Sequence, residues 1–291
     1  MIYEPLGTGI QIALGKVVLQ RHIQRTNDLE GGGKLQKNIL LILLILALGT
    51  VSAFGAPFST SNVRPLASIG TSPSNELSLQ TILNQIYGVG KMDVITGEQT
   101  AAMFKEGSNG AFSPRLQFEY SAASEAVGIF SGVDSTQLTN VDIFKDVLMP
   151  LGAKKITATV SWEDPSNPTT IYVSASDPNN CGVYVNCGVF SGITQGFFGF
   201  YLETSGTHYY TPDSLNGGDA RVLVYNGRSV GQADNTWAFA FEDGVNLGDR
   251  DYNDRVFTVE SIMPVPEPAS VVLFGTLLVL CASGLRRRRV S

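Results

Sequence analysis

Acidic side chains are concentrated between residues 242 and 254. Five carboxylates fall within this stretch, Glu242, Asp243, Asp249, Asp251 and Asp254, and the amide of Asn253 lies among them. Carboxylates so close together repel one another unless protons or a cation neutralise them. Carboxylate and amide oxygens are the ligands that Ca²⁺ prefers. We therefore expect a calcium site formed by Asp249, Asp251 and Asn253, completed by Asp243 or Asp254.

The alternate spacing of these ligands resembles the start of an EF-hand loop, but the resemblance ends there. The sixth loop position is Asp254 rather than Gly, and residues 255–262 have the pattern of a strand. A loop site of weak affinity, with a Kd of roughly 10⁻⁴ to 10⁻³ M, is the expectation. The alternative is a turn network without metal, in which Asn253 and Asp254 cap backbone N–H groups and Arg250 or Arg255 balances the charge.

Side chains with catalytic potential are few. The two histidines are His22 and His208, and the motifs GxSxG, HExxH, GxGxxG and the P-loop are absent from the sequence. Neighbouring residues of a strand point to opposite faces, so Glu163–Asp164 and Glu242–Asp243 are expected to be poor acid pairs. We expect a protein that is not an enzyme, with a carboxylate-only glycosidase as the alternative.

Charge and cysteine content indicate the environment. Residues 54–263 contain 22 acidic and 11 basic residues, a net charge of −11 that disfavours nucleic acid and favours a cation or a neutral glycan as partner. Cys181 and Cys187 are close enough in sequence to form a disulfide in an oxidising compartment, worth about 2 kcal/mol by chain entropy. Two free thiols are the alternative, and a zinc site is less favoured because it needs four ligands.

Strands are the elements that must position the acidic residues. Apolar and polar residues alternate in several runs, as at Ile156, Ala158 and Val160, and Pro, Asn, Asp and Gly separate the runs. The expected strands are 156–162, 170–175, 197–202, 221–225, 236–241 and 256–262. This pattern predicts a mainly β domain, an antiparallel β-sandwich of jelly-roll-like form.

One helix is expected before the strands. Leu79, Ile82, Leu83 and Ile86 recur at helical spacing, with Ser78 as the N-cap and Gly88 as the stop. The Ser/Pro-rich residues 54–75 before it are expected to be a linker.

The chain begins with an extension, residues 1–33, that no pattern explains; a start assigned upstream of the true one would account for it. Residues 34–53 then combine Lys34 and Lys37, a run of Ile, Leu and Ala, and Val51-Ser52-Ala53. These are the parts of a secretory signal peptide, with an uncleaved anchor as the competing interpretation.

Residues 264–291 form a tail with three features in a fixed order. Val265, Pro266, Glu267 and Pro268 make an extended strip, residues 269–285 form an uncharged span, and a cluster of arginines follows: Arg286, Arg287, Arg288 and Arg289. The span is just long enough for a transmembrane helix at about 1.5 Å per residue. The arginines stop transfer and stay cytoplasmic, which places the body outside.

This tail resembles the PEP-CTERM sorting signal of Gram-negative bacteria. The resemblance implies recognition by exosortase, a membrane-embedded cysteine peptidase, and an association with exopolysaccharide; a plain membrane anchor is the alternative. It also implies an exported protein that passes through an inner-membrane intermediate to the cell surface or the extracellular matrix.

A second resemblance covers residues 196–262. An aromatic strand, Glu242-Asp243, a Gly-containing loop and the run from Asp249 to Asp254 entering an apolar strand are similar to the bacterial domain of unknown function DUF4114. On this basis residues 76–263 are expected to form a DUF4114-like extracellular β domain.

Three functions therefore remain open. The first is an exported surface or matrix protein whose β-sandwich needs calcium. The second is a secreted module that binds or hydrolyses glycans, and the third is a structural shell component without a ligand.

Overall fold

The computed structural model describes residues 58–100, 102–107, 113–122, 125–132, 134–145, 155–162, 167–231, 236–244 and 247–266, all within the compact unit Phe54–Ser291. The expected extension, signal peptide and transmembrane span lie outside these residues, as do Glu267, Pro268 and the arginines Arg286, Arg287, Arg288 and Arg289. Within the described part of the chain, no helix is long and apolar enough to cross a membrane.

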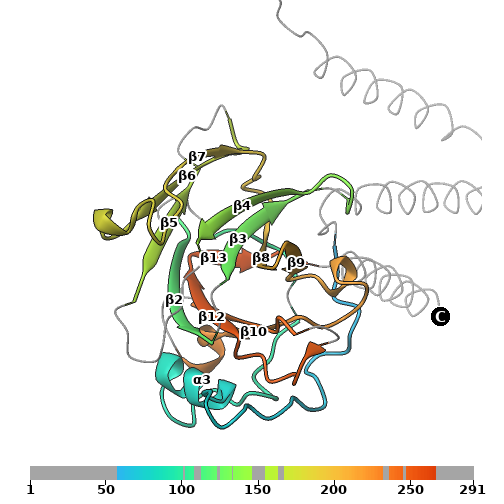
Figure 1. The fold of residues 1–291 in the computed structure, drawn as a ribbon. Coiled ribbons are helices and arrows are strands. Elements are labelled where there is room, and N and C mark those ends of the chain that lie inside the picture. The colour runs from blue at the N-terminus through green and yellow to red at the C-terminus, as the bar shows by residue number, and fades with distance from the viewer. Residues whose placement is uncertain are drawn as a thin grey trace, which may run out of the picture. The chain divides into compact units, whose positions relative to one another are not determined.

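The described chain is mainly β-structure, and every strand pair in it is antiparallel (Figure 1). A seven-stranded sheet has the order β10 (Val222–Asn226), β11 (Trp237–Phe241), β12 (Arg255–Glu260), β2 (Arg115–Ser121), β5 (Thr157–Ser161), β6 (Thr170–Ala175) and β7 (Gly188–Ser191). A four-stranded sheet has the order β4 (Thr139–Phe144), β3 (Ala126–Ser131), β8 (Gly199–Thr204) and β9 (Thr207–Tyr210). The short strands β1 (Phe104–Glu106) and β13 (Ile262–Pro264) pair with each other.

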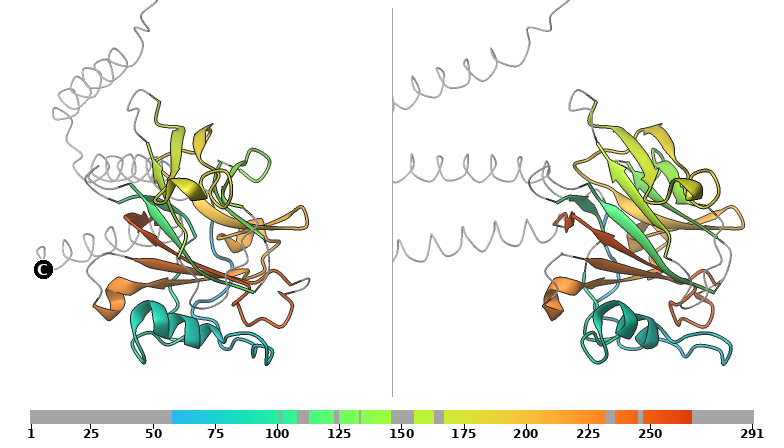
Figure 2. Two further views of the ribbon diagram at one scale, coloured as in Figure 1. Left: turned by 60° about the vertical axis from the view of Figure 1, so that its left-hand side comes forward. Right: turned by 90° about the vertical axis from the view of Figure 1, so that its left-hand side faces the viewer.

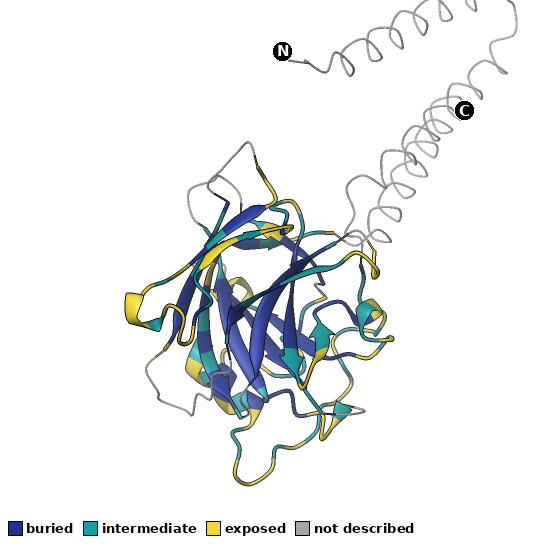
Figure 3. Cartoon of the chain, turned by 45° about the horizontal axis from the view of Figure 1, so that its top comes forward, coloured by how far each residue is buried: buried dark blue, intermediate teal, exposed yellow. Residues whose placement is uncertain are grey.

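The main core lies between the two larger sheets. The ring of Phe200 in β8 lies 4.7 Å from that of Phe239 in β11, and Phe118 in β2 lies 5.3 Å from Phe144 in β4. Figure 3 shows the buried residues concentrated along the strands. Burial of such aromatic pairs stabilises the packing of one sheet against the other, which is the arrangement of a β-sandwich. The two larger sheets contain seven and four strands, whereas a jelly roll contains eight strands in total, so the strand count is not that of a jelly roll.

Helix α3 (Leu79–Tyr87) covers the other face of the seven-stranded sheet (Figures 1 and 2). Its buried side chains, Leu79, Ile82 and Leu83, pack in one cluster with Leu223, Tyr225, Ala238 and Ala240 of β10 and β11. Ser78 Oγ accepts a hydrogen bond from the Thr81 backbone N–H at 3.3 Å, and Gly88 ends the helix with φ 101°. The predicted helix and both of its caps are confirmed.

Most of the expected strands are confirmed to within two residues, with two differences at their ends. The run 197–202 becomes a strand that starts at Gly199, and the run 256–262 divides into β12 and β13 because Ser261 takes a left-handed conformation with φ 62°. Three 3₁₀ helices, η1 (Pro178–Asn180), η2 (Asp213–Leu215) and η3 (Gly227–Val230), lie in the connections that the structure describes.

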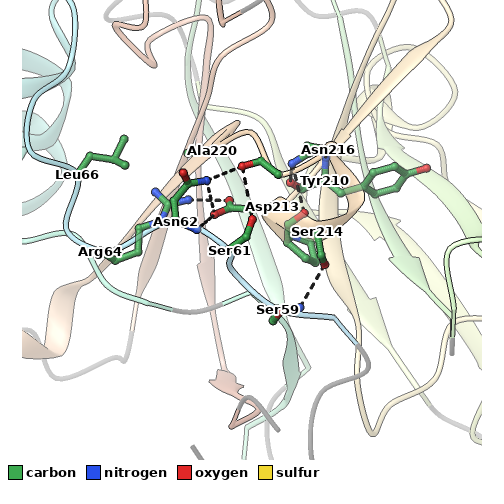
Figure 4. Close-up of polar contacts among 12 residues, drawn as sticks. Ser59, Ser61, Asn62, Arg64, Leu66, Tyr210, Asp213, Ser214, Asn216 and Ala220 are labelled. Atoms are coloured by element: carbon green, nitrogen blue, oxygen red, sulfur yellow. Dashed lines mark hydrogen bonds and ion pairs between the residues drawn. The ribbon is translucent and has the colours of Figure 1, made fainter. Parts of the chain in front are cut away.

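The stretch expected to be a linker belongs to the fold over its described part, residues 58–75. Figure 4 shows Arg64 and Asn62 reaching Asp213 at η2. Arg64 Nη2 lies 2.8 Å from Asp213 Oδ1, and Arg64 Nη1 pairs with Glu98. The Asn62 backbone N–H and Nδ2 both donate to Asp213 Oδ2, at 3.0 and 2.9 Å. The charged side chains of Arg64, Glu98 and Asp213 are at most 2% exposed. Buried ion pairs therefore hold residues 58–75 against the rest of the domain.

Cys181 and Cys187 are joined by a disulfide with a Cα–Cα distance of 5.3 Å. They lie in the connection between β6 and β7, which pair as an antiparallel hairpin.

Candidate metal centre

The acidic stretch forms the connection between the neighbouring strands β11 and β12, where residues 245 and 246 lie outside the described chain. Buried contacts anchor it: the Tyr252 hydroxyl donates to the Ala220 carbonyl at 2.8 Å, and the Gly70 N–H donates to the Arg250 carbonyl at 2.7 Å. Gly70 has no room for a Cβ, which would come 1.7 Å from the Asp249 carbonyl oxygen. The segment 58–75 and the acidic connection are therefore in direct backbone contact.

A first acidic group forms where the end of segment 58–75 meets the acidic connection. Carboxylate oxygens of Glu76, Asp249 and Asp251 all lie within 4.8 Å of one another. Glu76 lies two residues before Ser78, the N-cap of helix α3, whereas the two aspartates come from the acidic connection. Asp251 is buried and Asp249 is exposed, so the group extends from the interior to the surface.

Two buried oxygens beside this group have no hydrogen-bond partner among the described residues, Asp251 Oδ2 and Asn253 Oδ1. Other atoms of the same side chains are engaged: Asp251 Oδ1 accepts from the Asn253 N–H at 3.3 Å, and Asn253 Nδ2 donates to the Leu77 carbonyl at 2.7 Å and to Ser72 Oγ at 3.0 Å. Asp251 and Asn253 are 1% and 0% exposed. Buried oxygens without partners are uncommon, and a bound cation would supply the missing partner.

Burial and neighbouring charge act on the pKa values of this group. Burial raises the pKa of Asp251, and the nearby Asp249 charge adds to the rise. The pKa of Glu76 is also raised, by burial first and then by the charge of Asp251. A cation among the carboxylates would act in the opposite direction and favour their ionised forms.

A second acidic group consists of Glu242, Asp243 and Asp254, whose oxygens also lie within 4.8 Å of one another. Backbone donors hold two of them: the Asp243 N–H donates to Asp254 Oδ2 at 2.8 Å, and the Gly244 N–H donates to Glu242 Oε1 at 3.1 Å. Burial is the main cause that raises the pKa of Glu242 to about 7 and that of Asp254 to about 9. At neutral pH this group therefore retains protons.

Glu125, just before β3, contacts Asp243 of the second group and the buried guanidinium of Arg255. Burial and its hydrogen bond to Asp243 raise the pKa of Glu125 to about 8. Its Oε2 lies 3.8 Å from Nε of Arg255, and Arg255 Nη2 donates to the Glu125 carbonyl at 2.7 Å. The Arg255 guanidinium also lies 5.0 Å from the Phe118 ring centroid. Protons and Arg255 thus already neutralise this group.

The carboxylates are arranged differently from the sequence expectation in two respects, while calcium binding itself stays a prediction. The expected ligands do not form one group, because Asp249 and Asp251 join Glu76 while Asp243 and Asp254 join Glu242. Glu242 and Asp243 also converge instead of pointing apart, because β11 ends at Phe241 and the alternation of a strand ends with it. Glu163 and Asp164 lie outside the described residues.

Elements of the expected turn network are present in the same connection. Asp254 accepts a backbone N–H, and Arg255 pairs with a carboxylate, although that partner is Glu125 rather than a residue of the acidic stretch. Asn253, by contrast, uses its amide nitrogen as a donor, and its oxygen has no hydrogen-bond partner within the described ranges. The turn network therefore accounts for the second acidic group and leaves the first unexplained.

Sequence reasoning missed Glu76 and Glu125. Glu76 lies just upstream of the predicted N-cap Ser78, and Glu125 stands alone between small residues, so neither carried a local signal. Only the tertiary fold brings them to the acidic connection.

The fold also places several large aromatic residues and the start of the expected sorting motif. Trp162, Trp237 and Tyr225 are core residues, whereas Tyr209 and Tyr210 are half-buried in β9. Val265 of the expected sorting motif packs against the cluster of Phe58 and Phe130, and its N–H donates to the Met103 carbonyl at 2.9 Å. Pro266 is exposed.

The comparisons with known proteins identify part of this chain. No curated protein and no solved structure matches it. Residues 190–262 match the family model DUF4114, described as a domain of unknown function. The match includes all the acidic residues from Glu242 to Asp254 and excludes both Glu76 and Glu125. It covers fewer residues than the DUF4114-like domain expected at 76–263. The chain therefore carries a DUF4114 domain at residues 190–262.

Proposed function

We propose that this chain is an exported cell-surface or extracellular-matrix protein whose β domain is stabilised by a divalent cation, calcium first, and that it is not an enzyme. Glu76, Asp249, Asp251 and Asn253 are the proposed ligands. The observation that supports the proposal is a pair of buried oxygens, Asp251 Oδ2 and Asn253 Oδ1, that find no hydrogen-bond partner in the described part of the chain and lie beside three convergent carboxylates.

Calcium suits this set of ligands because it accepts six to eight oxygens in flexible geometry. The side chains that converge here offer only oxygen atoms as ligands, and the site is open to solvent at Asp249, so waters can complete the shell. A cation here would bridge the segment before helix α3 and the connection after β11. Its binding would therefore stabilise the contact between two parts of the chain that are distant in sequence.

Calcium should raise the thermal stability of the full-length chain. With a Kd of about 1 mM, a free concentration of about 10 mM adds roughly 1.4 kcal/mol, or about 3 to 6 °C in Tm for a domain of this size. The measurement is thermal unfolding in calcium and in chelator.

Two variants make this measurement specific. Asp251→Asn should lose the calcium-dependent rise in Tm, whereas Glu260→Gln should keep it, since Glu260 lies at the end of β12 and belongs to neither acidic group. Glu260 would be the twelfth residue of an EF-hand loop, so its variant also tests that interpretation. An equal rise in both variants, or no rise in the wild type, would favour the turn network without metal.

Export and sorting are supported by the sequence of the two ends. The signal-like residues 34–53 and the tail with Val265, Pro266, Glu267 and Pro268 before an apolar span support exosortase as a partner and the membrane as an intermediate location. Association with extracellular polysaccharide follows from the same resemblance.

Sorting would leave a defined C-terminus. Cleavage at the motif should release a body that ends between Met263 and Pro268, and deletion of Arg286 to Arg289 should impair processing. Mass spectrometry of the mature protein measures this, and a C-terminus still at Ser291 in cells with active exosortase would contradict it.

A further inference from the structure

A pocket of about 530 Å³ lies at the start of helix α3, and two residues of the first acidic group, Glu76 and Asp251, form part of its wall. Residues 69–74 and 76–81 supply most of the lining, together with Val94 and Asp251. The volume is within the range of small-molecule sites. Segment 58–75 thus forms a pocket wall as well as a packed part of the fold.

The side chains of this pocket suit a ligand with many hydroxyl groups. Five of the lining residues carry a hydroxyl: Thr71, Ser72, Ser74, Ser78 and Thr81. Hydroxyl groups both donate and accept hydrogen bonds, as sugar hydroxyls do. The half-buried Leu77 and Val94 add apolar surface that can contact the C–H face of a sugar ring.

Charge excludes other classes of small ligand. No Lys or Arg lines the pocket, whereas Glu76 and Asp251 both do. Phosphates, carboxylates and acidic sugars would meet no Lys or Arg here, and the three carboxylates of the first acidic group outweigh the charge of one divalent cation. A neutral ligand is therefore favoured.

The same two carboxylates connect the pocket with the candidate metal centre. Glu76 and Asp251 are two of the three carboxylates that converge there, and Asp251 Oδ2 has no hydrogen-bond partner among the described residues. Three carboxylates and Asn253 leave a calcium ion with open positions, since it takes six to eight oxygens. Two adjacent hydroxyls of a sugar can fill such positions.

We propose that this pocket binds a neutral sugar through a pair of adjacent hydroxyls that coordinate the cation held by Glu76, Asp249 and Asp251. The inference rests on the proposed cation site and adds the class of ligand. The sugar is a free monosaccharide or a terminal residue of a polysaccharide, and both present the same hydroxyl pair.

Calorimetric titration of the full-length chain, purified in a detergent without a sugar head group, tests the proposal. The probes are the methyl glycosides of mannose, galactose, fucose and glucose, and a neutral polysaccharide, dextran. At least one probe should bind in calcium, and its affinity should fall at least tenfold in chelator. Binding of a glycoside alone indicates a monosaccharide site, and binding of dextran indicates a polysaccharide terminus.

Two matched variants separate the pocket from the cation. Ser74→Phe places a ring at the exposed wall of the pocket and should reduce sugar affinity at least tenfold while the calcium-dependent rise in Tm remains. Ser135→Phe, at an exposed serine between β3 and β4, should change neither property.

The outcomes distinguish this inference from the proposed function. Calcium-dependent stabilisation without binding of any probe overturns the sugar site alone. Sugar binding that is equal in chelator, or unchanged by Ser74→Phe, also overturns it. Absence of both calcium stabilisation and sugar binding overturns the two proposals together.

Discussion

Replacing Arg64 by Met should be among the most destabilising single changes in the described chain. The substitution leaves Glu98 and Asp213 without their cation, at side-chain exposures of 1% and 0%. Loss of one partner from a buried ion pair costs about 3 to 5 kcal/mol because the remaining charge is uncompensated. At about 2 to 4 °C per kcal/mol for a domain of this size, Tm should fall by roughly 6 to 20 °C.

Urea unfolding followed by circular dichroism measures this loss, with Arg115→Met as the matched control. Arg115 is exposed in β2, so its variant should stay within about 0.5 kcal/mol of the wild type. The triple variant Arg64→Met, Glu98→Gln, Asp213→Asn should recover part of the loss, because no uncompensated charge remains. If Arg64→Met and Arg115→Met were equally stable, segment 58–75 would be a linker after all.

Two further predictions concern the second acidic group and the disulfide. The pKa values of Glu242 (about 7), Glu125 (about 8) and Asp254 (about 9) are raised, so the fold favours the protonated forms. Their stabilisation is complete below the unfolded carboxyl pKa near 4, declines as pH rises above it, and is fully lost once pH has passed the folded values, at about 9. In chelator, the free energy of unfolding should be lower at pH 9 than at pH 6, and Asp254→Asn should weaken this dependence; a rise toward pH 9 would refute the assignment. Reduction of the Cys181–Cys187 bond should lower stability by about 2 kcal/mol. Labelling of both thiols in protein purified from the periplasm without reduction would show that the bond is absent there.

Local patterns predicted those parts of the fold that local interactions determine. Helix α3 carries its periodicity and both caps within eleven residues, from Ser78 to Gly88, and β6 was found with its observed bounds. Strand β2 was missed although Leu116, Phe118 and Tyr120 alternate with polar residues, so its signal was present and unused. Strand β4 had a weaker signal because Asp142 interrupts a short apolar run.

Contacts between distant segments were not predictable in the same way. Asp249, Asp251 and Asn253 were found because they are neighbours in sequence, whereas Glu76 reaches them only when the segment before α3 folds against the acidic connection. The burial of Arg64 follows from the same packing. A Ser/Pro-rich composition indicates a linker unless a buried partner such as Asp213 is known, and the sequence alone did not indicate that partner.

The most direct test of the cation proposal is calorimetric titration of the full-length chain with calcium, beside Asp251→Asn and Glu76→Gln. The first acidic group should take up one calcium ion per chain with a Kd of roughly 10⁻⁴ to 10⁻³ M, and each variant should weaken binding at least tenfold. Absence of heat at about 10 mM calcium, or unchanged binding in both variants, would contradict the proposed site.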